Sequence, residues 1–452
     1  MDPSAFARIT LEQLRAGGGL KWRAFPDCIG AFVAEMDFGI APPIRAALHE
    51  AVERAQVGYL SATPLHALAE ACAHWQARHH GWEVPTDAIK AVPDVLAALE
   101  VVSRHYLPAG APVAVPVPCY MPFLPLLALL GHPVLQVPMH RRGHDWELDE
   151  DALEAAFNGG ARMLLLCNPH NPIGKVYTRP ELERIAAIAE RHDARVFADE
   201  IHAPLVYPGR PHLPYAAVSR QAAHQAITAV SASKAWNLAG LKCAQLILTR
   251  PEDLLRWRQL DHFAGNSTST LGVLAHTVAW DRGDDWLHGV LGYLRGNRDL
   301  LGRLLHQHLP QIGWIPPQGT YLAWLDCRAL ALPAAPHLFF RRHAHVALTD
   351  GGECGNGGEG HVRLNFAMPR PLLVEAVTRM ADAVPGRAVA APAQAKCTSP
   401  PRNGRHGEPS AASARTPSPS VMRPMRVPVV PACSSARATA SRAAVEALKH
   451  SS

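Results

Sequence analysis

The stretch VSASKAWNLAGLK, residues 230–242, determines which fold and which chemistry the sequence predicts. An apolar run, residues 227–230, leads into it and is typical of a β-strand buried in a sheet. Two hydroxyls and Lys234 follow where this strand ends. Because ligands of open α/β sheets bind at the carboxyl ends of the strands, Lys234 is a candidate nucleophile at such a site.

Two further apolar runs are also followed by polar residues at the point where the predicted strand ends. The run LLLC at 164–167 leads into the proline-containing loop NPHNPIG, and VFADEIH at 196–202 places Asp199 at the end of a strand. Pyridoxal phosphate (PLP) requires such a set. Its aldehyde needs an amine, its pyridine nitrogen needs a fixed carboxylate, and its phosphate needs hydroxyls, backbone N–H groups and a cation. The sequence therefore predicts a PLP site, with Lys234 as the imine-forming residue.

Strand-like and helical segments alternate along the chain from about residue 43 to residue 249. A helix is predicted over 180–192, because Pro180 suits a first helical turn and the apolar residues recur at helical spacing. Between such helices lie short β-rich runs at 88–92, 113–117, 163–167, 196–198, 227–230 and 245–248. This alternation predicts an α/β domain with a mostly parallel sheet.

The pattern changes after residue 266, where long helical stretches run to about residue 309. Strand-like runs at 320–326, 346–349 and 362–366 then predict a smaller α+β domain. We expect four parts: an N-terminal segment that packs with the small domain (1–45), a large PLP-binding domain (46–284), a small C-terminal domain (285–385) and a basic Pro/Ser/Ala-rich tail (386–452).

Charge is distributed unevenly along the chain, whose net charge is +5. The last 67 residues hold ten Lys and Arg but two acidic residues, so the preceding 385 residues carry a net charge of −3. Since the body is not basic, no nucleic-acid partner is predicted. Nine prolines and little apolar periodicity predict that the tail is disordered. We interpret it as a dispensable extension, with a basic interaction arm as the alternative.

Thiols and apolar runs indicate the compartment. The nine cysteines form no C-x-x-C pair, and the N-terminus lacks the features of a secretory signal, so we expect reduced thiols and a cytoplasmic protein. The most apolar stretch, residues 123–130, is too short for a membrane span. The 25 histidines have no acidic or thiol partners at ligand spacing, so no metal site is predicted.

Four segments together carry a family resemblance. N-P-H-N-P-x-G, A-D-E-I-H and S-x-S-K-x-x-N-L-x-G-L occur in this order, and KW at 21–22 and FVAEMDF at 32–38 precede them. They resemble fold-type I PLP enzymes of the class I/II aminotransferase superfamily. The opening is similar to that of the cystathionine β-lyase (C–S lyase) branch, which includes the maltose-regulon modulator. The resemblance spans about residues 20–385 and implies a large domain, its sheet sandwiched by helices, plus a smaller domain.

The resemblance implies a role for each matching residue. Lys234 would bind the cofactor as an imine and then take the substrate's Cα proton, Asp199 would pair with the pyridinium nitrogen, and Arg363 would bind the substrate α-carboxylate. The remaining implied cofactor contacts are Asn171 to the ring oxygen, Tyr120 stacked on the ring, Ser231, Ser233, Lys242 and Val95 at the phosphate, and Tyr59 at the phosphate of a neighbouring subunit. A homodimer with shared active sites is therefore expected.

Some of these residues have plainer interpretations. Tyr120 could be an ordinary loop aromatic, Arg363 a structural ion-pair residue and Ser231 the end of a strand. His202, at the end of A-D-E-I-H, is interpreted as a packed or capping histidine.

Three positions depart from the family pattern. Asp94, in the sequence Pro-Asp-Val at 93–95, stands where the family usually has a glycine before its phosphate-binding helix. It can cap that helix, but its charge would repel phosphate if it pointed inward. Glu35 replaces an aspartate of the opening motif, and Lys242 replaces an arginine, so its phosphate contact would be a point charge.

The predicted function is α,β-elimination from cystathionine or a related cysteine S-conjugate, which yields a thiol, pyruvate and ammonia. An aminotransferase is the first alternative, because it would use the same Lys234, Asp199 and Arg363. A regulatory binding protein with residual lyase activity is the second.

Overall fold

The computed structural model describes residues 4–260 and 267–385. The predicted tail, residues 386–452, lies outside the described residues. Within the described part no helix is both long and apolar enough to cross a membrane.

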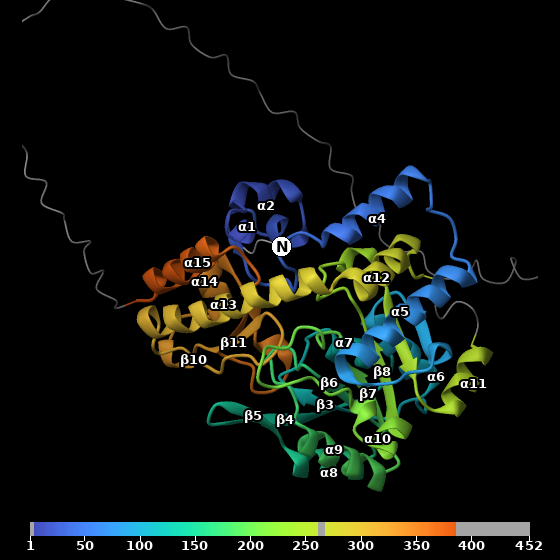
Figure 1. Ribbon diagram of the computed structural model, residues 1–452. Coiled ribbons are helices and arrows are strands. Elements are labelled where there is room, and N and C mark those ends of the chain that lie inside the picture. Colours follow the sequence, from blue (N-terminus) through green and yellow to red (C-terminus); the bar gives the residue numbers. More distant parts are fainter. Residues whose placement is uncertain (1–3, 261–266, 386–452) are drawn as a thin grey trace, which may run out of the picture. The chain divides into compact units, whose positions relative to one another are not determined.

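An eight-stranded sheet forms the centre of the protein (Figure 1). Its strand order is β2-β9-β8-β7-β6-β3-β4-β5. The neighbours from β8 to β4 pair in parallel, whereas β9 is antiparallel to both β2 and β8, and β5 is antiparallel to β4. The strands are β2 (Ile89–Val92), β3 (Val113–Val117), β4 (Val134–Arg142), β5 (Asp145–Leu148), β6 (Met163–Cys167), β7 (Arg195–Asp199), β8 (Ala226–Val230) and β9 (Ala244–Leu248).

Helices cover both faces of this sheet. The helices of the chain are α1 (Ser4–Ala7), α2 (Leu11–Gly17), α3 (Leu20–Arg23), α4 (Pro42–Glu53), α5 (Ala62–His80), α6 (Val95–His105), α7 (Phe123–Leu129), α8 (Glu150–Asn158), α9 (Arg179–Arg191), α10 (Arg220–Gln225), α11 (Pro251–Gln259), α12 (Thr270–Arg282), α13 (Asp284–His308), α14 (Pro336–His343) and α15 (Arg370–Ala383). The prediction of an α/β fold with a mostly parallel sheet between helices is confirmed.

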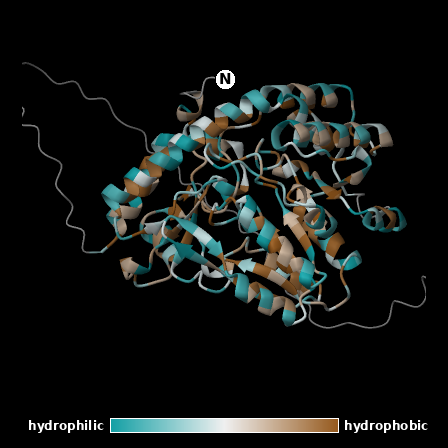
Figure 2. Ribbon diagram, turned by 60° about the horizontal axis from the view of Figure 1, so that its bottom comes forward, coloured by the Kyte–Doolittle hydropathy of each residue, from teal (hydrophilic) through white to brown (hydrophobic). Residues whose placement is uncertain are grey.

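Side chains alternate between the two faces along each central strand, as the pleat requires. Met163 and Leu165 of β6 belong to a core with α6 and α7, whereas Leu164 and Leu166 belong to a second core with α9 and α12. Because both faces are covered, β3, β6, β8 and β9 are buried throughout, which explains their unbroken apolar sequences. In Figure 2 these central strands are largely brown, while the helices around them alternate teal and brown.

A smaller antiparallel sheet has the order β10-β11-β14-β13. Its strands are β10 (Gly313–Trp314), β11 (Leu322–Asp326), β13 (Thr349–Asp350) and β14 (His361–Asn365). The N-terminal segment reaches this region through β1 (Ile29–Gly30), which pairs in parallel with β12 (Val346–Ala347). The described residues form one compact unit, and its second core extends from the large sheet into the small one. The domain boundaries at residues 45 and 284 stay predictions.

Candidate active site

The parallel strands bring the predicted site residues to one edge of the large sheet. Strands β3, β6, β7 and β8 run in the same direction, so the residues that follow each of them meet at their carboxyl ends. Strand β2 is parallel to β8 through their common antiparallel neighbour β9, so helix α6 also starts at this edge. Lys242, two residues before the first residue of β9, lies there as well.

Lys234 is the partly buried lysine in the loop after β8. Its Nζ donates a hydrogen bond to the Ala34 carbonyl oxygen at 3.1 Å. Burial lowers the pKa of Lys234 to about 8, and the Arg363 guanidinium acts in the same direction. A lysine with a lowered pKa offers a neutral amine at a much lower pH than a surface lysine does.

Asp199 ends β7 and is buried. Its Oδ1 accepts a hydrogen bond from the Ile201 N–H at 3.1 Å. Its Oδ2 is approached by the Cys167 thiol at 3.7 Å, which is a weak donor. Burial raises the pKa of Asp199 to about 6. A cationic partner would stabilise the charged form of this buried carboxyl, and the protonated pyridine nitrogen of PLP has that charge.

Arg363 lies on β14 in the small sheet and is also buried. One terminal nitrogen donates to Asn171 Oδ1 at 3.1 Å, and the other donates to the Phe32 carbonyl oxygen at 2.9 Å. The Arg363 Nε is buried and has no hydrogen-bond partner within the described residues. This donor set fits an incoming carboxylate, because a carboxylate can accept two hydrogen bonds from one guanidinium.

At the phosphate end, Ser231 and Ser233 occupy different environments. The buried Ser231 Oγ donates to the Cys243 carbonyl at 2.8 Å and accepts from the Ser233 N–H at 3.1 Å. The Ser231 hydroxyl therefore stabilises the turn after β8 through these two hydrogen bonds. Its contact with the phosphate stays a prediction. Ser233 is partly exposed. Lys242 Nζ lies 2.8 Å from Asp94 Oδ2, and Val95 is the first residue of α6.

The two predicted tyrosines also differ in their surroundings. Tyr120 is half-buried, and burial raises the pKa of its hydroxyl, while the Arg363 charge opposes this shift and the Asp199 charge adds to it. Tyr59 is fully exposed at the rim of a cavity of about 800 Å³ that Leu60 and Trp257 also line.

Two parts of the site, the Ala34 carbonyl oxygen and Tyr321, were not predicted from the sequence. The Ala34 carbonyl oxygen accepts a hydrogen bond from the Tyr321 hydroxyl at 2.9 Å as well as from Lys234. Tyr321 comes from the start of the small sheet, and no sequence motif marks it. His202 caps no helix: its buried Nδ1 has no partner among the described residues, and its ring lies edge-on to Tyr321. Burial, reinforced by Lys234 and Arg363, lowers the pKa of His202 to about 3.

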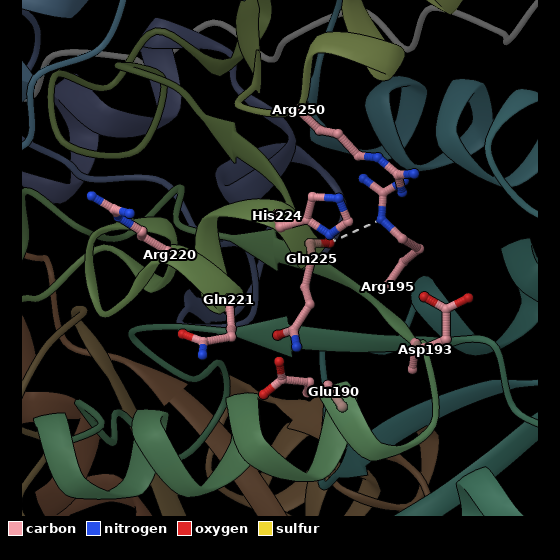
Figure 3. A pocket seen from close by; sticks show the side chains of 10 residues that line it. Glu190, Asp193, Arg195, Arg220, Gln221, His224, Gln225 and Arg250 are labelled. Carbon is pink, nitrogen blue, oxygen red and sulfur yellow. Dashed lines mark hydrogen bonds between the residues drawn. The ribbon is translucent and has the colours of Figure 1, made fainter.

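A separate cavity of about 330 Å³ lies at the opposite edge of the sheet (Figure 3). Arg195 begins β7 and Gln225 directly precedes β8, so this cavity adjoins the amino ends of the strands. Figure 3 shows the Arg195 Nε bonded to the Gln225 carbonyl oxygen at 3.0 Å. Arg195 is also paired with Asp253. None of the predicted site residues lines this cavity. In the described ranges, no cluster of His, Cys, Asp and Glu could hold a metal ion.

Comparison with known proteins gives a consistent result. Residues 30–380 match the family described as aminotransferase class I and II. A Mycobacterium tuberculosis protein with the provisional name cystathionine β-lyase is 43% identical over 84% of this chain and 98% of its own length. The cystathionine β-lyase of Corynebacterium glutamicum is 37% identical over 82% and 98%. Cystalysin from Treponema denticola, whose crystal structure contains PLP, superimposes with a TM-score of 0.77 at 26% identity over 83% of this chain and 97% of its own.

Proposed function

The chain belongs to the class I and II aminotransferase family, and from that premise we propose that it is a PLP-dependent carbon–sulfur β-lyase. Its reaction is the α,β-elimination of cystathionine or a related cysteine S-conjugate to a thiol, pyruvate and ammonia. The observation that carries this proposal is the identity of 37% to a cystathionine β-lyase over nearly the whole of that enzyme.

The described residues fit the cofactor. Asp199 offers a buried carboxylate without a cationic hydrogen-bond partner, and Lys234 offers an amine with a lowered pKa. We propose that Lys234 Nζ holds the cofactor's aldehyde carbon, that Asp199 holds the proton on the pyridine nitrogen, and that Asn171 contacts the ring oxygen. Tyr120 would cover the ring, and Ser233, Lys242, Ser231 and Val95 would surround the phosphate.

PLP, when bound, supplies an electron sink that stabilises negative charge at the substrate's Cα. The residues of the chain orient the substrate and move its protons. Arg363, with its unpartnered Nε, binds the α-carboxylate and thereby fixes the direction of the Cα–H bond. Lys234 Nζ would take the Cα proton, and the Ala34 carbonyl oxygen would hold the amine in place. Cleavage of the bond from Cβ to sulfur would then release the thiolate, and water would hydrolyse the remaining three-carbon fragment to pyruvate and ammonia.

A matched pair of assays tests the proposal. Purified protein is incubated with L-cystathionine and assayed for pyruvate, and separately with an amino acid plus 2-oxoglutarate and assayed for glutamate. Pyruvate formation without a keto acid is expected. Glutamate formation alone would establish the aminotransferase instead, which the 28% identity to an aspartate aminotransferase supports less strongly.

The same proposal includes a homodimer in the cytoplasm. Tyr59 lines a cavity together with Leu60 and Trp257, and its full exposure suits a contact with a second subunit. The seven cysteines of the described residues are all free thiols, which supports a reducing compartment.

A further inference from the structure

Asp94 stands at the start of α6, the helix that begins at the carboxyl edge of the sheet. Its Oδ1 caps the helix by accepting the Ala97 N–H at 2.8 Å. Its Oδ2 accepts the Lys242 ammonium, also at 2.8 Å. Both acceptor oxygens of this carboxylate are therefore engaged by groups that ordinarily bind anions.

The position of Lys242 is fixed by the fold. Its backbone adopts a left-handed conformation with φ of 49°, which is unfavourable for a residue with a side chain. Its carbonyl oxygen accepts the Ser269 N–H at 3.1 Å, which links it to the start of α12. Helix α6 and Lys242 thus form a built anion site, and the Asp94 carboxylate occupies it.

The carboxylate carries its charge throughout the neutral pH range. Burial raises the pKa of Asp94, but the hydrogen bonds from Lys242 and Ala97 outweigh burial and hold the pKa below its ordinary value. The field of Asp94 also reaches the centre of the site, because it contributes to the pKa values of Lys234 and Tyr120. The charges of Asp94 and Lys242 cancel, so the pair offers no net positive charge to a phosphate dianion.

We propose that Asp94 is an electrostatic competitor of the cofactor phosphate. Its carboxylate holds the cation and the helix terminus that the phosphate needs, so phosphate binding requires an exchange of partners at Lys242. The affinity for the phosphorylated cofactor is consequently lower than the same fold would give with a neutral cap. This inference rests on the proposed function, because it takes PLP as the ligand.

The test is the substitution Asp94→Asn, which removes the charge but keeps a good helix cap, so α6 should start at the same residue. Dissociation constants are measured for PLP and for pyridoxal, which lacks the phosphate, from the absorbance of the Lys234-bound cofactor. We expect Asp94→Asn to bind PLP about fivefold more tightly, the size of one partly exposed charge interaction. Its affinity for pyridoxal should stay within about twofold of the parent, because the Asp94 charge acts only weakly on Lys234, where the aldehyde binds.

Two further variants serve as controls. Asp149 caps α8 with the same geometry, accepting the Ala152 N–H at 2.8 Å and pairing with His140, so Asp149→Asn should change neither constant. Lys242→Met should weaken PLP binding and leave pyridoxal binding unchanged.

The outcomes separate the two proposals. If the parent protein does not capture PLP on Lys234, the proposed function itself fails. Two results would overturn the proposed competition by Asp94 and leave the proposed function standing. In the first, the parent captures PLP but Asp94→Asn binds PLP no more tightly. In the second, Asp94→Asn increases the affinity for pyridoxal as much as the affinity for PLP.

Discussion

Lys234 and Asp199 have pKa values that are shifted in opposite directions by the same cause. Burial disfavours the charged form of both groups, so the pKa of the amine falls to about 8 and that of the carboxyl rises to about 6. Burial thus destabilises the charged form of each group. The cofactor would relieve both, because it covers the amine and brings a positive charge to the carboxylate. The opposite pKa shifts of Lys234 and Asp199 are the strongest argument from single residues that this site binds PLP.

The first prediction concerns Asp199→Asn, which is nearly isosteric and should preserve packing. The pyridine nitrogen would lose its counter-charge, so pyruvate release should fall at least about a hundredfold, as when other active sites lose a preorganised charge partner. Cofactor occupancy should fall less, because Lys234 and the phosphate contacts remain. Turnover and occupancy are measured on the same sample. Turnover within a few-fold of the parent at full occupancy would show that Asp199 is not the pyridinium partner.

The second prediction follows from the lowered pKa of Lys234. The neutral amine is the nucleophile, so capture of the cofactor aldehyde by cofactor-free protein should accelerate as pH rises and level off above about 8. Below that value the rate should fall about tenfold per pH unit. Initial rates of the absorbance change are recorded from pH 6 to 10. A midpoint near that of an ordinary lysine, about 10.4, would contradict the structure.

At the scale of elements, the N-terminal segment organises the site. The Phe32 carbonyl oxygen accepts from Arg363 and the Ala34 carbonyl oxygen accepts from Lys234. This segment is fixed by a buried ion pair, in which Lys21 Nζ lies 2.9 Å from Asp37 Oδ2. The Trp22 indole N–H donates to the other oxygen of Asp37 at 2.8 Å. The residues KW and MDF, which carry the family resemblance, therefore fix the backbone of this segment. The carbonyl groups of Phe32 and Ala34, which lie between them in the sequence, accept hydrogen bonds from Arg363 and Lys234.

The third prediction tests this ion pair. Lys21→Met leaves the Asp37 carboxylate buried without its cation, which should reduce the free energy of unfolding by about 3–5 kcal/mol. Denaturant unfolding of the variant and the parent is compared. Glu50 and Arg54 form an exposed ion pair on α4, and Arg54→Met, the matched control, should cost less than about 1 kcal/mol. Equal, small losses in both variants would mean that the buried pair does not anchor the segment.

Local sequence was sufficient for the central strands and insufficient for contacts between distant segments. Strands β3 and β6 match their predicted limits, because strands buried on both faces have unbroken apolar sequences. Strands β4 and β5 were not predicted, since an exposed edge hairpin rich in His, Arg and Glu lacks that signal. Lys234 and Asp199 could be predicted because each lies in the sequence at, or a few residues after, the end of an apolar strand. Tyr321 and the Ala34 carbonyl oxygen were missed because they meet only after folding, 287 residues apart.

At the scale of the whole molecule, the exposed Tyr59 raises the question of what completes the site. Its side chain lies fully in solvent, beside the exposed Val57, at the rim of a large open cavity. Large exposed apolar groups that gather at one place on a surface mark an interaction site. A symmetric dimer would bury this region of both subunits and carry each Tyr59 toward the partner's site, because a two-fold interface uses the same surface twice.

The last prediction uses that symmetry. We expect Lys234→Ala to be inactive and Tyr59→Ala to be strongly impaired, because one lacks the amine and the other lacks a phosphate contact in the partner. In a heterodimer of the two variants, one site receives Lys234 from one subunit and Tyr59 from the other and is intact. Random re-association of equal amounts should therefore restore about a quarter of parental activity, since about half of the dimers are mixed and each has one of two sites whole. Activity is measured after the variants are dissociated and reassembled together, beside each variant reassembled alone. If Tyr59 served the site of its own subunit, no dimer would contain an intact site, and the mixture would be no more active than the average of its components.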